Sequence, residues 1–286
     1  MGNSIIETIK KRKSIRTFET TPVTDEHLQF LNDYICEETN LIGPLGRRAR
    51  FEMIKVRNNV SDRGIKLGTY GFIKNHQGYI VGKMENTKLG LVEFGYIFEK
   101  LILFATKLGI GTCWIGGSFS RTSFQKEIDL QASEIIPCIT PIGYPSQKQR
   151  LFDKTLRYVT KADNKKGWEE LFFSGDFGTP LTESSAETLA LPIEMVRLGP
   201  SASNKQPWRL VMSEDKKQCH FYLENTPNYS GNKLGFEMQR IDIGIAIAHF
   251  ELSCKEVAIE GKWLIDDPKL ELPNEHTEYV ISWEVN

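Results

Sequence analysis

Residues 199–208 have the sequence Gly-Pro-Ser-Ala-Ser-Asn-Lys-Gln-Pro-Trp, directly after a predicted helix. The two prolines stiffen this turn, and its Ser, Asn and Gln side chains offer donors and acceptors suited to the edge of a heteroaromatic ring. A second Gly-Pro pair, Gly43-Pro44, also follows a predicted helix, but residues 43–51 contain neither Asn nor Gln. The two stretches suggest that the chain has two related halves that have diverged at this turn.

The predicted elements of the two halves occur in the same order. The first half has helices over 4–11 and 25–38, strands over 51–56 and 78–83, a long amphipathic helix over 89–108 and a strand over 135–144. The second half has a helix over 189–198, strands over 208–213 and 220–224, a long helix over 240–257 and a strand over 279–284.

Direct alignment of the halves supports a repeat. With an offset of 149 residues, Trp114 aligns with Trp263, and with an offset of 158 the turn at residues 21–24 aligns with residues 179–182. We predict two copies of one α/β unit, over residues 1–160 and 161–286. Chance similarity between two helix–strand alternations is the alternative.

The first copy opens with a basic run that the second copy lacks. Arg12-Lys13-Ser14-Ile15-Arg16 places three cations and a hydroxyl within five residues, which suits charge-assisted hydrogen bonds to a phosphate. The aligned positions of the second copy carry Glu170 and Phe172, which would repel or exclude a phosphate. A solvated basic surface is the competing interpretation.

Two more stretches distinguish the first copy. Residues 109–117 end in the pair Gly116-Gly117, whose backbone N–H groups a planar ligand could approach closely. The spacing of these glycines does not fit a dinucleotide fingerprint, and the stretch follows a helix where that fingerprint follows a strand. Gly143-Tyr144-Pro145 precedes Lys148 and Arg150, a second basic cluster.

The composition excludes several classes of protein. The 286 residues are 40% apolar and 26% charged, with a formal charge of -1, as expected for a soluble globular protein of one large or two modest domains. Residues 1–160 hold 23 of the 36 Lys and Arg and 16 of the 37 Asp and Glu. Residues 161–286 therefore hold 13 basic and 21 acidic residues. This asymmetry indicates either a charged ligand or a solvated surface, while the total argues against a protein that coats nucleic acid.

Other features bear on the protein's location. The five cysteines are odd in number and lack CxxC spacing, so they indicate a reducing compartment with neither a disulfide framework nor a zinc site, and no histidine spacing suggests a metal. The longest apolar stretch, residues 96–115, contains three charged residues and is unsuited to a bilayer, and no signal-peptide core follows residues 1–16. We predict a cytoplasmic protein without a membrane or nucleic-acid partner.

Together these residues resemble the FMN-dependent nitroreductase family. Three motifs in order carry the resemblance, which covers most of the chain: the basic run at 12–16, the Gly-Tyr-Pro turn at 143–145 and the Pro-Ser-Ala segment, our name for residues 200–208. The resemblance implies an α+β fold (a three-layer α/β arrangement) with a central, mostly antiparallel sheet flanked by helices.

The distribution of the motifs departs from ordinary members, which are homodimers with FMN at the subunit interface. Here the basic run and the Pro-Ser-Ala segment belong to different copies. The chain therefore resembles the duplicated, single-chain branch of the family, and we expect a monomer that acts as an intramolecular pseudo-dimer with one composite flavin site.

The resemblance also assigns roles to individual residues. Arg12, Ser14 and Arg16 would hold the ribityl phosphate, Lys13 would contribute from within the motif, and Lys148 or Arg150 would close over it. Gly116 and Gly117 would present N–H groups to flavin N5 and O4, and Trp114 and Ile115 would line a ring face, although a core position explains Trp114 equally well. The second copy would contribute Pro200, Ser201, Ser203, Asn204 and Gln206.

The implied activity is that of a ping-pong reductase. NADH or NADPH would deliver hydride to flavin N5, and a small-molecule acceptor such as a nitroaromatic, a quinone or a free flavin would then take it. No protein acid or base is required, so no catalytic residue is predicted. The alternatives are a flavin-binding protein without efficient turnover and a binder of nucleic acid or an anionic surface through the basic half.

Overall fold

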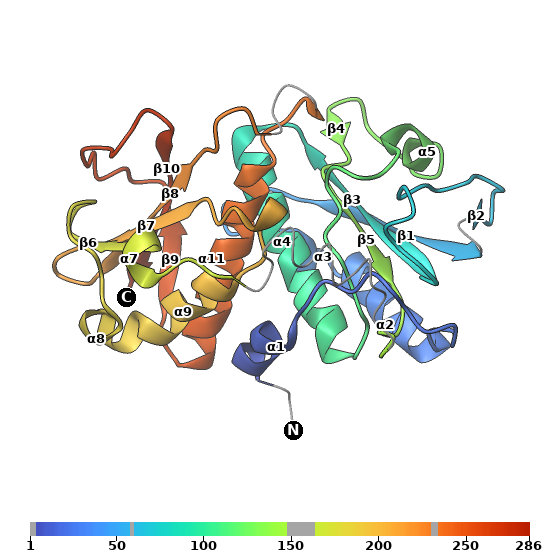
Figure 1. Ribbon diagram of the computed structural model, residues 1–286, viewed down its shortest axis with the longest axis horizontal. Coiled ribbons are helices and arrows are strands. Elements are labelled where there is room, and N and C mark those ends of the chain that lie inside the picture. Colours follow the sequence, from blue (N-terminus) through green and yellow to red (C-terminus); the bar gives the residue numbers. More distant parts are fainter. Residues whose placement is uncertain (1–3, 58–59, 148–163, 230–233) are drawn as a thin grey trace. The chain divides into compact units, whose positions relative to one another are not determined.

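The computed structural model describes residues 4–57, 60–147, 164–229 and 234–286 (Figure 1). Its contacts divide the chain into two compact units. One unit comprises residues 11–160, and the other comprises residues 161–286 together with residues 1–10. Within the part of the chain that the structure describes, no helix is long and apolar enough to cross a membrane.

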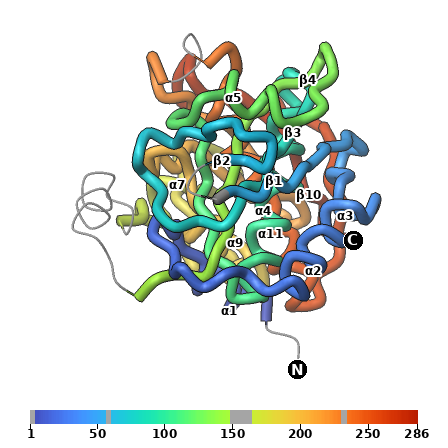
Figure 2. The backbone as a smooth tube through the Cα atoms, turned by 90° about the vertical axis from the view of Figure 1, so that its right-hand side faces the viewer, coloured from blue at the N-terminus to red at the C-terminus, as the bar shows by residue number. Residues whose placement is uncertain are grey.

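The named strands of the 11–160 unit all pair antiparallel. Its strands are β1 (Arg50–Arg57), β2 (Val60–Ser61), β3 (Gly78–Glu85), β4 (Glu134–Ile135) and β5 (Ile139–Ile142). β1 pairs with β2 and β3, and β3 pairs also with β4 and β5; β1, β2 and β3 lie side by side in Figures 1 and 2. β3 is buried over all but its last residue, as expected for a central strand with both faces covered.

The helices of this unit are α2 (Asp25–Cys36), α3 (Glu38–Leu41), α4 (Lys88–Lys107) and α5 (Arg121–Gln125). The long helix α4 begins where the Thr87 hydroxyl accepts a hydrogen bond from the Gly90 amide at 3.0 Å. It ends before Gly109, which adopts a left-handed conformation with φ +75°. Phe94 and Phe98 are completely buried, so α4 forms much of the core against β3.

The second unit has the same kinds of element. Its helices are α7 (Trp168–Leu171), α8 (Glu183–Ala186), η1 (Glu187–Leu189), α9 (Ala190–Leu198), η2 (Ala202–Asn204) and α11 (Gln239–Glu256). Its strands are β6 (Phe172–Ser174), β7 (Trp208–Met212), β8 (Gln218–Glu224), β9 (Gly261–Leu264) and β10 (Thr277–Val285). The sheet order is β6-β7-β8-β10-β9, with only β6 and β7 parallel among these strands. The predicted mixed α+β fold with mostly antiparallel sheets is confirmed.

The pairing order is similar in the two units. In the first unit, β1 pairs with β3 and β3 pairs with β5. Isolated bridges then join Ile115 to Ile139 in β5 and Gly111 to Gly143, the residue after β5. In the second, β7, β8, β10 and β9 follow one another in the corresponding positions. Each unit places its longest helix between the second and third strands of this series along the chain.

The N-terminal helix α1 (Ile5–Lys11) packs with the second unit up to Lys10. The Glu256 carboxylate, at the end of α11, accepts hydrogen bonds from the Ser4 hydroxyl and from the amides of Ile5 and Ile6, the latter at 3.3 Å. These are the unpaired amides of a helix N-terminus, to which a carboxylate binds favourably. The predicted first copy, residues 1–160, includes residues 1–10, whereas the contacts group these residues with the second unit.

Candidate functional site

The basic run is held in an extended conformation by backbone hydrogen bonds inside the 11–160 unit. The Ile15 amide donates to the Thr112 carbonyl at 2.8 Å, and the Lys74 amide donates to the Arg16 carbonyl at 2.9 Å. A methyl group on Gly111 would lie 3.0 Å from the Ile15 side chain, so the glycine permits this close pairing. The run therefore has a fixed backbone from which its side chains project.

Three side chains of the run are available to a ligand. Within the described residues, Lys13, Ser14 and Arg16 make no side-chain hydrogen bond and no ion pair. Their two cationic groups and one hydroxyl match the donors that a phosphate requires.

Arg12 has a different environment. Its Nε lies 3.9 Å from Oε1 of Glu99, whose side chain is completely buried. The other Glu99 oxygen accepts a hydrogen bond from Trp114 Nε1 at 2.8 Å. Because a buried carboxylate without a counter-charge is costly, the position of Arg12 indicates a structural contribution to the unit.

The glycine strip, residues 115–117, leaves two amide groups without partners. Ile115 pairs with Ile139 through two backbone hydrogen bonds of 3.0 Å, which fixes the start of the strip. Beyond it, the N–H groups of Gly116 and Gly117 donate no hydrogen bond within the described residues, and a methyl group on Gly117 would meet nothing within 4 Å. The strip therefore presents two free donors, with open space beside Gly117.

Arg121 holds the glycine strip in place through the Gly116 carbonyl, a role that the sequence did not predict. Its guanidinium donates to the Gly116 carbonyl and, at 3.1 Å each, to the carbonyls of Ile136 and Pro137. Burial lowers the pKa of Arg121, yet three carbonyl partners satisfy the group. A single arginine at the start of the short helix α5 gave no signal in the sequence.

Trp114 and Ile115 pack inside their own unit. Ile115 is 4% exposed within the hydrophobic core, and the Trp114 ring lies edge-on to Phe98 with 4.7 Å between centroids. Together with the hydrogen bond from Trp114 to Glu99, this packing accounts for both residues without a ligand. A place for these side chains against a flavin ring face stays a prediction from the resemblance.

The Pro-Ser-Ala segment has an unusual backbone. Ser203, Asn204 and Gln206 have φ values of 51°, 53° and 48°, in the left-handed region that residues other than glycine seldom occupy. The Ala202 amide donates to Asp242 at 3.0 Å and the Gln206 amide donates to the Ser201 hydroxyl at 2.9 Å. Such strain persists only where surrounding contacts impose it, and it is typical of functional segments.

The two amide side chains of the segment hold the preceding stretch of the same unit. Gln206 is 2% exposed; its Oε1 accepts from the Lys166 amide at 2.9 Å and its Nε2 donates to the Asn204 carbonyl at 3.2 Å. Asn204 donates to the Asn164 carbonyl at 2.7 Å and accepts from Lys165 at 3.4 Å. The structure thus gives both amides a role in positioning residues 164–166.

The remaining predicted residues of the segment differ in exposure. Pro200 and Ser201 are half-buried, and Ser203 is exposed, with its hydroxyl 2.9 Å from that of Tyr229. Ser203 is therefore the predicted polar side chain of this segment that lies most open to solvent.

Asp242 supports the Pro-Ser-Ala segment by accepting a hydrogen bond from it, a role that the sequence did not predict. It lies in the first turn of α11, is 3% exposed, and accepts from Ala202 with one oxygen. Its other oxygen has no partner among the described residues, and burial raises the pKa of the carboxyl to about 8. Glu93, in the first turns of α4, occupies the same place in the other unit, where it accepts from the amides of Leu45 and of Arg47, the latter at 2.7 Å.

The Gly-Tyr-Pro turn has local structural roles. A methyl group on Gly143 would lie 2.8 Å from the Phe18 ring, and the Tyr144 hydroxyl lies 2.9 Å from Nδ1 of His27, near the start of α2. The Ser146 amide donates to the Thr17 carbonyl at 3.1 Å, so the chain after the turn runs beside the end of the basic run. Lys148 and Arg150 lie outside the described residues.

One comparison with known proteins identifies the family and another shows the fold. The profile of the family described as "Putative TM nitroreductase" matches residues 4–254. The crystal structure of a "putative nitroreductase" from Thermotoga maritima aligns over 100% of this chain and 95% of that chain, with a TM-score of 0.61 and 18% identity, which shows a shared fold. None of the curated protein sequences compared with the chain matches it.

Smaller solved structures align with part of the chain. A nitroreductase with bound FMN from Desulfitobacterium hafniense covers 52% of this chain and 93% of its own, with 18% identity and a TM-score of 0.42. An FMN-dependent nitroreductase from Clostridium difficile covers 51% of this chain and 90% of its own, with 21% identity and a TM-score of 0.39. Since the family profile extends over most of the chain, the protein belongs to the "Putative TM nitroreductase" family.

Proposed function

We propose that the protein is an FMN-dependent NAD(P)H oxidoreductase of nitroreductase type, with one composite flavin site per chain. The observation that carries the proposal is the pair of free donor sets in the 11–160 unit. These are the side chains of Lys13, Ser14 and Arg16, and the backbone amides of Gly116 and Gly117.

The first donor set fits the phosphate of FMN. Two cations can balance the phosphate charge, and the guanidinium of Arg16 can form a bidentate pair with its oxygens while Ser14 donates a third hydrogen bond. Arg12 would support this grip by neutralising Glu99 rather than by binding the phosphate alone. Lys148 and Arg150 are also proposed to bind the phosphate, because they follow the Gly-Tyr-Pro turn in the sequence.

The second donor set fits the redox edge of the flavin. The free amides of Gly116 and Gly117 would donate to its ring acceptors, and Arg121 would keep them in place through the Gly116 carbonyl. When bound, FMN supplies reversible hydride acceptance at N5, which allows NADH or NADPH to reduce a nitroaromatic, a quinone or a free flavin. The protein's part is orientation and charge stabilisation at the ring.

The Pro-Ser-Ala segment would form the second wall of the site. We propose that Ser201 and Ser203, on a backbone fixed by Asp242 and Gln206, approach the ring and ribityl chain. Asn204 and Gln206 would act as positioning residues, because their side-chain amides already bind residues 164–166. A rigid segment binds with little loss of conformational entropy.

Two polar contacts that recur in both units support an internal duplication. A carboxylate near the start of the long helix accepts amide hydrogen bonds from the Gly-Pro turn, through Glu93 in one unit and Asp242 in the other. Further along the same helices, Glu99 accepts from Trp114 and Glu251 accepts from Trp263, each at 2.8 Å. We infer that one ancestral unit was duplicated and that the chain acts as a monomeric pseudo-dimer.

The phosphate assignment can be tested by charge reversal. In Arg16→Glu, FMN affinity should fall at least about a hundredfold, because a bidentate charge-assisted pair is replaced by repulsion. The measurement is FMN binding by quenching of flavin fluorescence, with the far-ultraviolet circular dichroism spectrum as the check on folding.

Lys126→Glu is the matched control for this test, because Lys126 is exposed in the same unit and the substitution changes the net charge equally. It should bind FMN as the unchanged protein does. Unchanged FMN affinity in folded Arg16→Glu would contradict the assignment.

A further inference from the structure

A cation is hydrogen-bonded to the glycine strip, on the side opposite to one of its free amides. The Arg121 guanidinium donates to the Gly116 carbonyl. This carbonyl and the Gly117 N–H belong to one peptide group, and in a trans peptide the two bonds point in opposite directions. The N–H that is open to a ligand is therefore one end of a peptide whose other end is bonded to a positive charge.

The core of the 11–160 unit holds Arg121 in one place. Its guanidinium also donates to the carbonyls of Ile136 and Pro137, at 3.1 Å each. It lies over the ring of Phe119, with 4.5 Å between Cζ and the ring centroid, and Phe119 is 4% exposed. None of these three partners and the Gly116 carbonyl is anionic, so they orient the guanidinium without cancelling its charge.

The charge of Arg121 can act on a ligand through the peptide. A cation bonded to a carbonyl oxygen polarises the peptide group, which strengthens its N–H as a donor. Arg121 is half-buried, so water screens its charge less than that of an exposed arginine. One peptide group and one hydrogen bond would separate the cation from a flavin atom that accepts from Gly117.

The chemistry proposed for the site changes the charge of that acceptor. Hydride transfer from NADH or NADPH to bound FMN moves two electrons and one proton, so a neutral oxidised ring gains one negative charge. A donor polarised by a cation binds an anion more tightly than a neutral acceptor. Arg121 and the Gly116–Gly117 peptide therefore favour reduced FMN over oxidised FMN.

The second unit lacks both parts of this arrangement. With the offset of 149 residues that aligns the two tryptophans, Gly117 aligns with Asp266, and Arg121 aligns with Leu270. A carboxylate at the first of these positions would repel a negative charge on a bound ring. The glycine peptide and its cation thus occur together, in the unit that has the basic run.

We infer that Arg121 is a positioning residue that sets the reduction potential of the bound flavin, by raising the affinity of the site for reduced FMN relative to oxidised FMN through the Gly116–Gly117 peptide. The inference rests on the proposed function, because it requires FMN at the glycine strip. It goes beyond fixing the strip, since a neutral anchor with the same hydrogen bonds would favour neither redox state.

The test compares Arg121→Gln, which keeps an amide donor without the charge, with Arg121→Lys, which keeps the charge. The midpoint potential of FMN bound to the full-length protein is measured at pH 7.5, by anaerobic equilibration with a dye of known potential. In Arg121→Gln the affinity for reduced FMN relative to oxidised FMN should fall about tenfold, which lowers the potential of a two-electron couple by about 30 mV. In Arg121→Lys this ratio should stay within about twofold of that in the unchanged protein.

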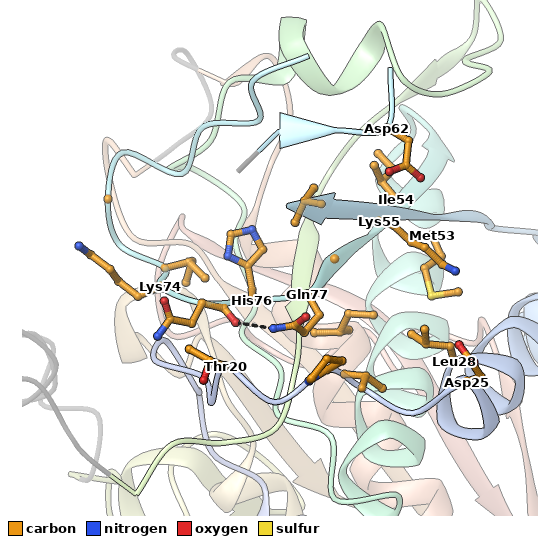
Figure 3. A pocket seen from close by; sticks show the side chains of 18 residues that line it. Thr20, Asp25, Leu28, Met53, Ile54, Lys55, Asp62, Lys74, His76 and Gln77 are labelled. Carbon is orange, nitrogen blue, oxygen red and sulfur yellow. Dashed lines mark hydrogen bonds between the residues drawn. The ribbon is translucent and has the colours of Figure 1, made fainter. Parts of the chain in front are cut away.

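Lys55→Gln is the matched control, because it also removes one positive charge from the 11–160 unit. Lys55 is exposed and lines a pocket between β1, β3 and the start of α2 (Figure 3), which shares no residue with the basic run or the glycine strip. Its potential should equal that of the unchanged protein. Quenching of flavin fluorescence gives the affinity for oxidised FMN, which should change less than about threefold in all three variants, and circular dichroism checks folding.

A purely structural role for Arg121 predicts a different result. Arg121→Gln would then lose affinity for both redox states equally and keep its potential, which would overturn the inference. An equal fall in potential in Arg121→Lys or in Lys55→Gln would overturn it too, because the charge at this position would not be the cause. The unchanged protein tests the inference even where Arg121→Gln does not fold: its bound FMN should have a higher potential than free FMN, and an equal or lower potential would overturn the inference.

The inference and the proposed function can fail separately. Flavin that binds and is bleached by NADH or NADPH, with the same potential in Arg121→Gln as in the unchanged protein, would overturn only the role of Arg121. A protein that binds no FMN would overturn both.

Discussion

At the scale of single residues, hydrogen bonding within each unit decides which side chains of a motif remain available to a ligand. Lys13, Ser14 and Arg16 are available, whereas Gln206 and Asn204 are already bonded to the chain. The sequence motif identifies the segment but cannot distinguish a residue that binds a ligand from one that positions it. The distinction depends on partners such as Lys166 and Asn164, about 40 residues away in the chain.

Asp242 provides a test of pH dependence at this scale. Its folded-state pKa of about 8 exceeds the ordinary value of 3.8, so the carboxyl is preferentially protonated in the folded protein. Its contribution to stability is therefore fully present below about pH 4 and is lost as pH rises through about 8. Asp242→Asn keeps an acceptor for the Ala202 amide without titrating.

We expect Asp242→Asn to gain stability relative to the unchanged protein as pH rises from 5 to 9, by about 4 kcal/mol. The measurement is the free energy of unfolding in urea at pH 5, 7 and 9. Asp33→Asn, at an exposed position, is the control and should show no such trend. A difference between Asp242→Asn and the unchanged protein that stays constant with pH would show that the carboxyl does not titrate in this range.

At the scale of helices and strands, the long periodic elements were predicted well. The predicted helix over 89–108 corresponds to α4 at Lys88–Lys107, because its apolar spacing and its following glycines are strong local signals. The predicted strand over 135–144 is instead divided into β4 and β5. Pro137 lies in the gap, where it cannot donate a backbone hydrogen bond to β3.

Other features of the elements depend on contacts between distant residues. The second half of the prediction lacked β9, a four-residue strand that is defined by pairing with β10 rather than by its own pattern. The attachment of α1 likewise depends on Glu256, some 250 residues away. Neither feature has a local signal in the sequence.

The tryptophan–glutamate contacts can be compared across the two units. Trp114→Phe and Trp263→Phe should each lower the free energy of unfolding by about 1–3 kcal/mol, because each leaves a buried carboxylate without its indole partner. Urea unfolding measures this loss, and Tyr70→Phe, at a position 71% exposed, should cause none.

The same variants test whether Trp114 belongs to the flavin site. If its role is structural, Trp114→Phe and Trp263→Phe should both retain FMN with less than about a threefold change in affinity. A loss of FMN affinity in Trp114→Phe alone would instead place this indole against the flavin ring.

At the scale of the whole molecule, the basic residues of the 11–160 unit include two groups. The first is in the basic run, where Lys13 and Arg16 are proposed to bind phosphate. The second is a set of arginines that pair with carboxylates of the same unit and so add no net charge: Arg47 with Glu85 at 3.0 Å, Arg48 with Glu38 at 2.8 Å, and Arg50 with Asp129 at 2.7 Å. Such pairing supports a folded surface and gives no indication of a nucleic-acid interface.

The proposed duplication, with unequal motifs in the two units, also predicts a stoichiometry. Only the 11–160 unit has the basic run and the glycine pair, since the second unit carries Glu170 and Phe172 at the positions aligned with Arg12 and Ser14. One chain should therefore bind one FMN, whereas two complete copies would bind two.

The most direct test of this account is a titration of the purified protein with FMN, followed by anaerobic addition of NADH or NADPH, with visible absorbance recorded throughout. We predict saturation at one FMN per chain and bleaching of the flavin band by at least one of the two reductants. Saturation at two FMN per chain would contradict the single composite site, and no FMN binding, or a bound flavin that neither reductant bleaches, would contradict the proposed oxidoreductase.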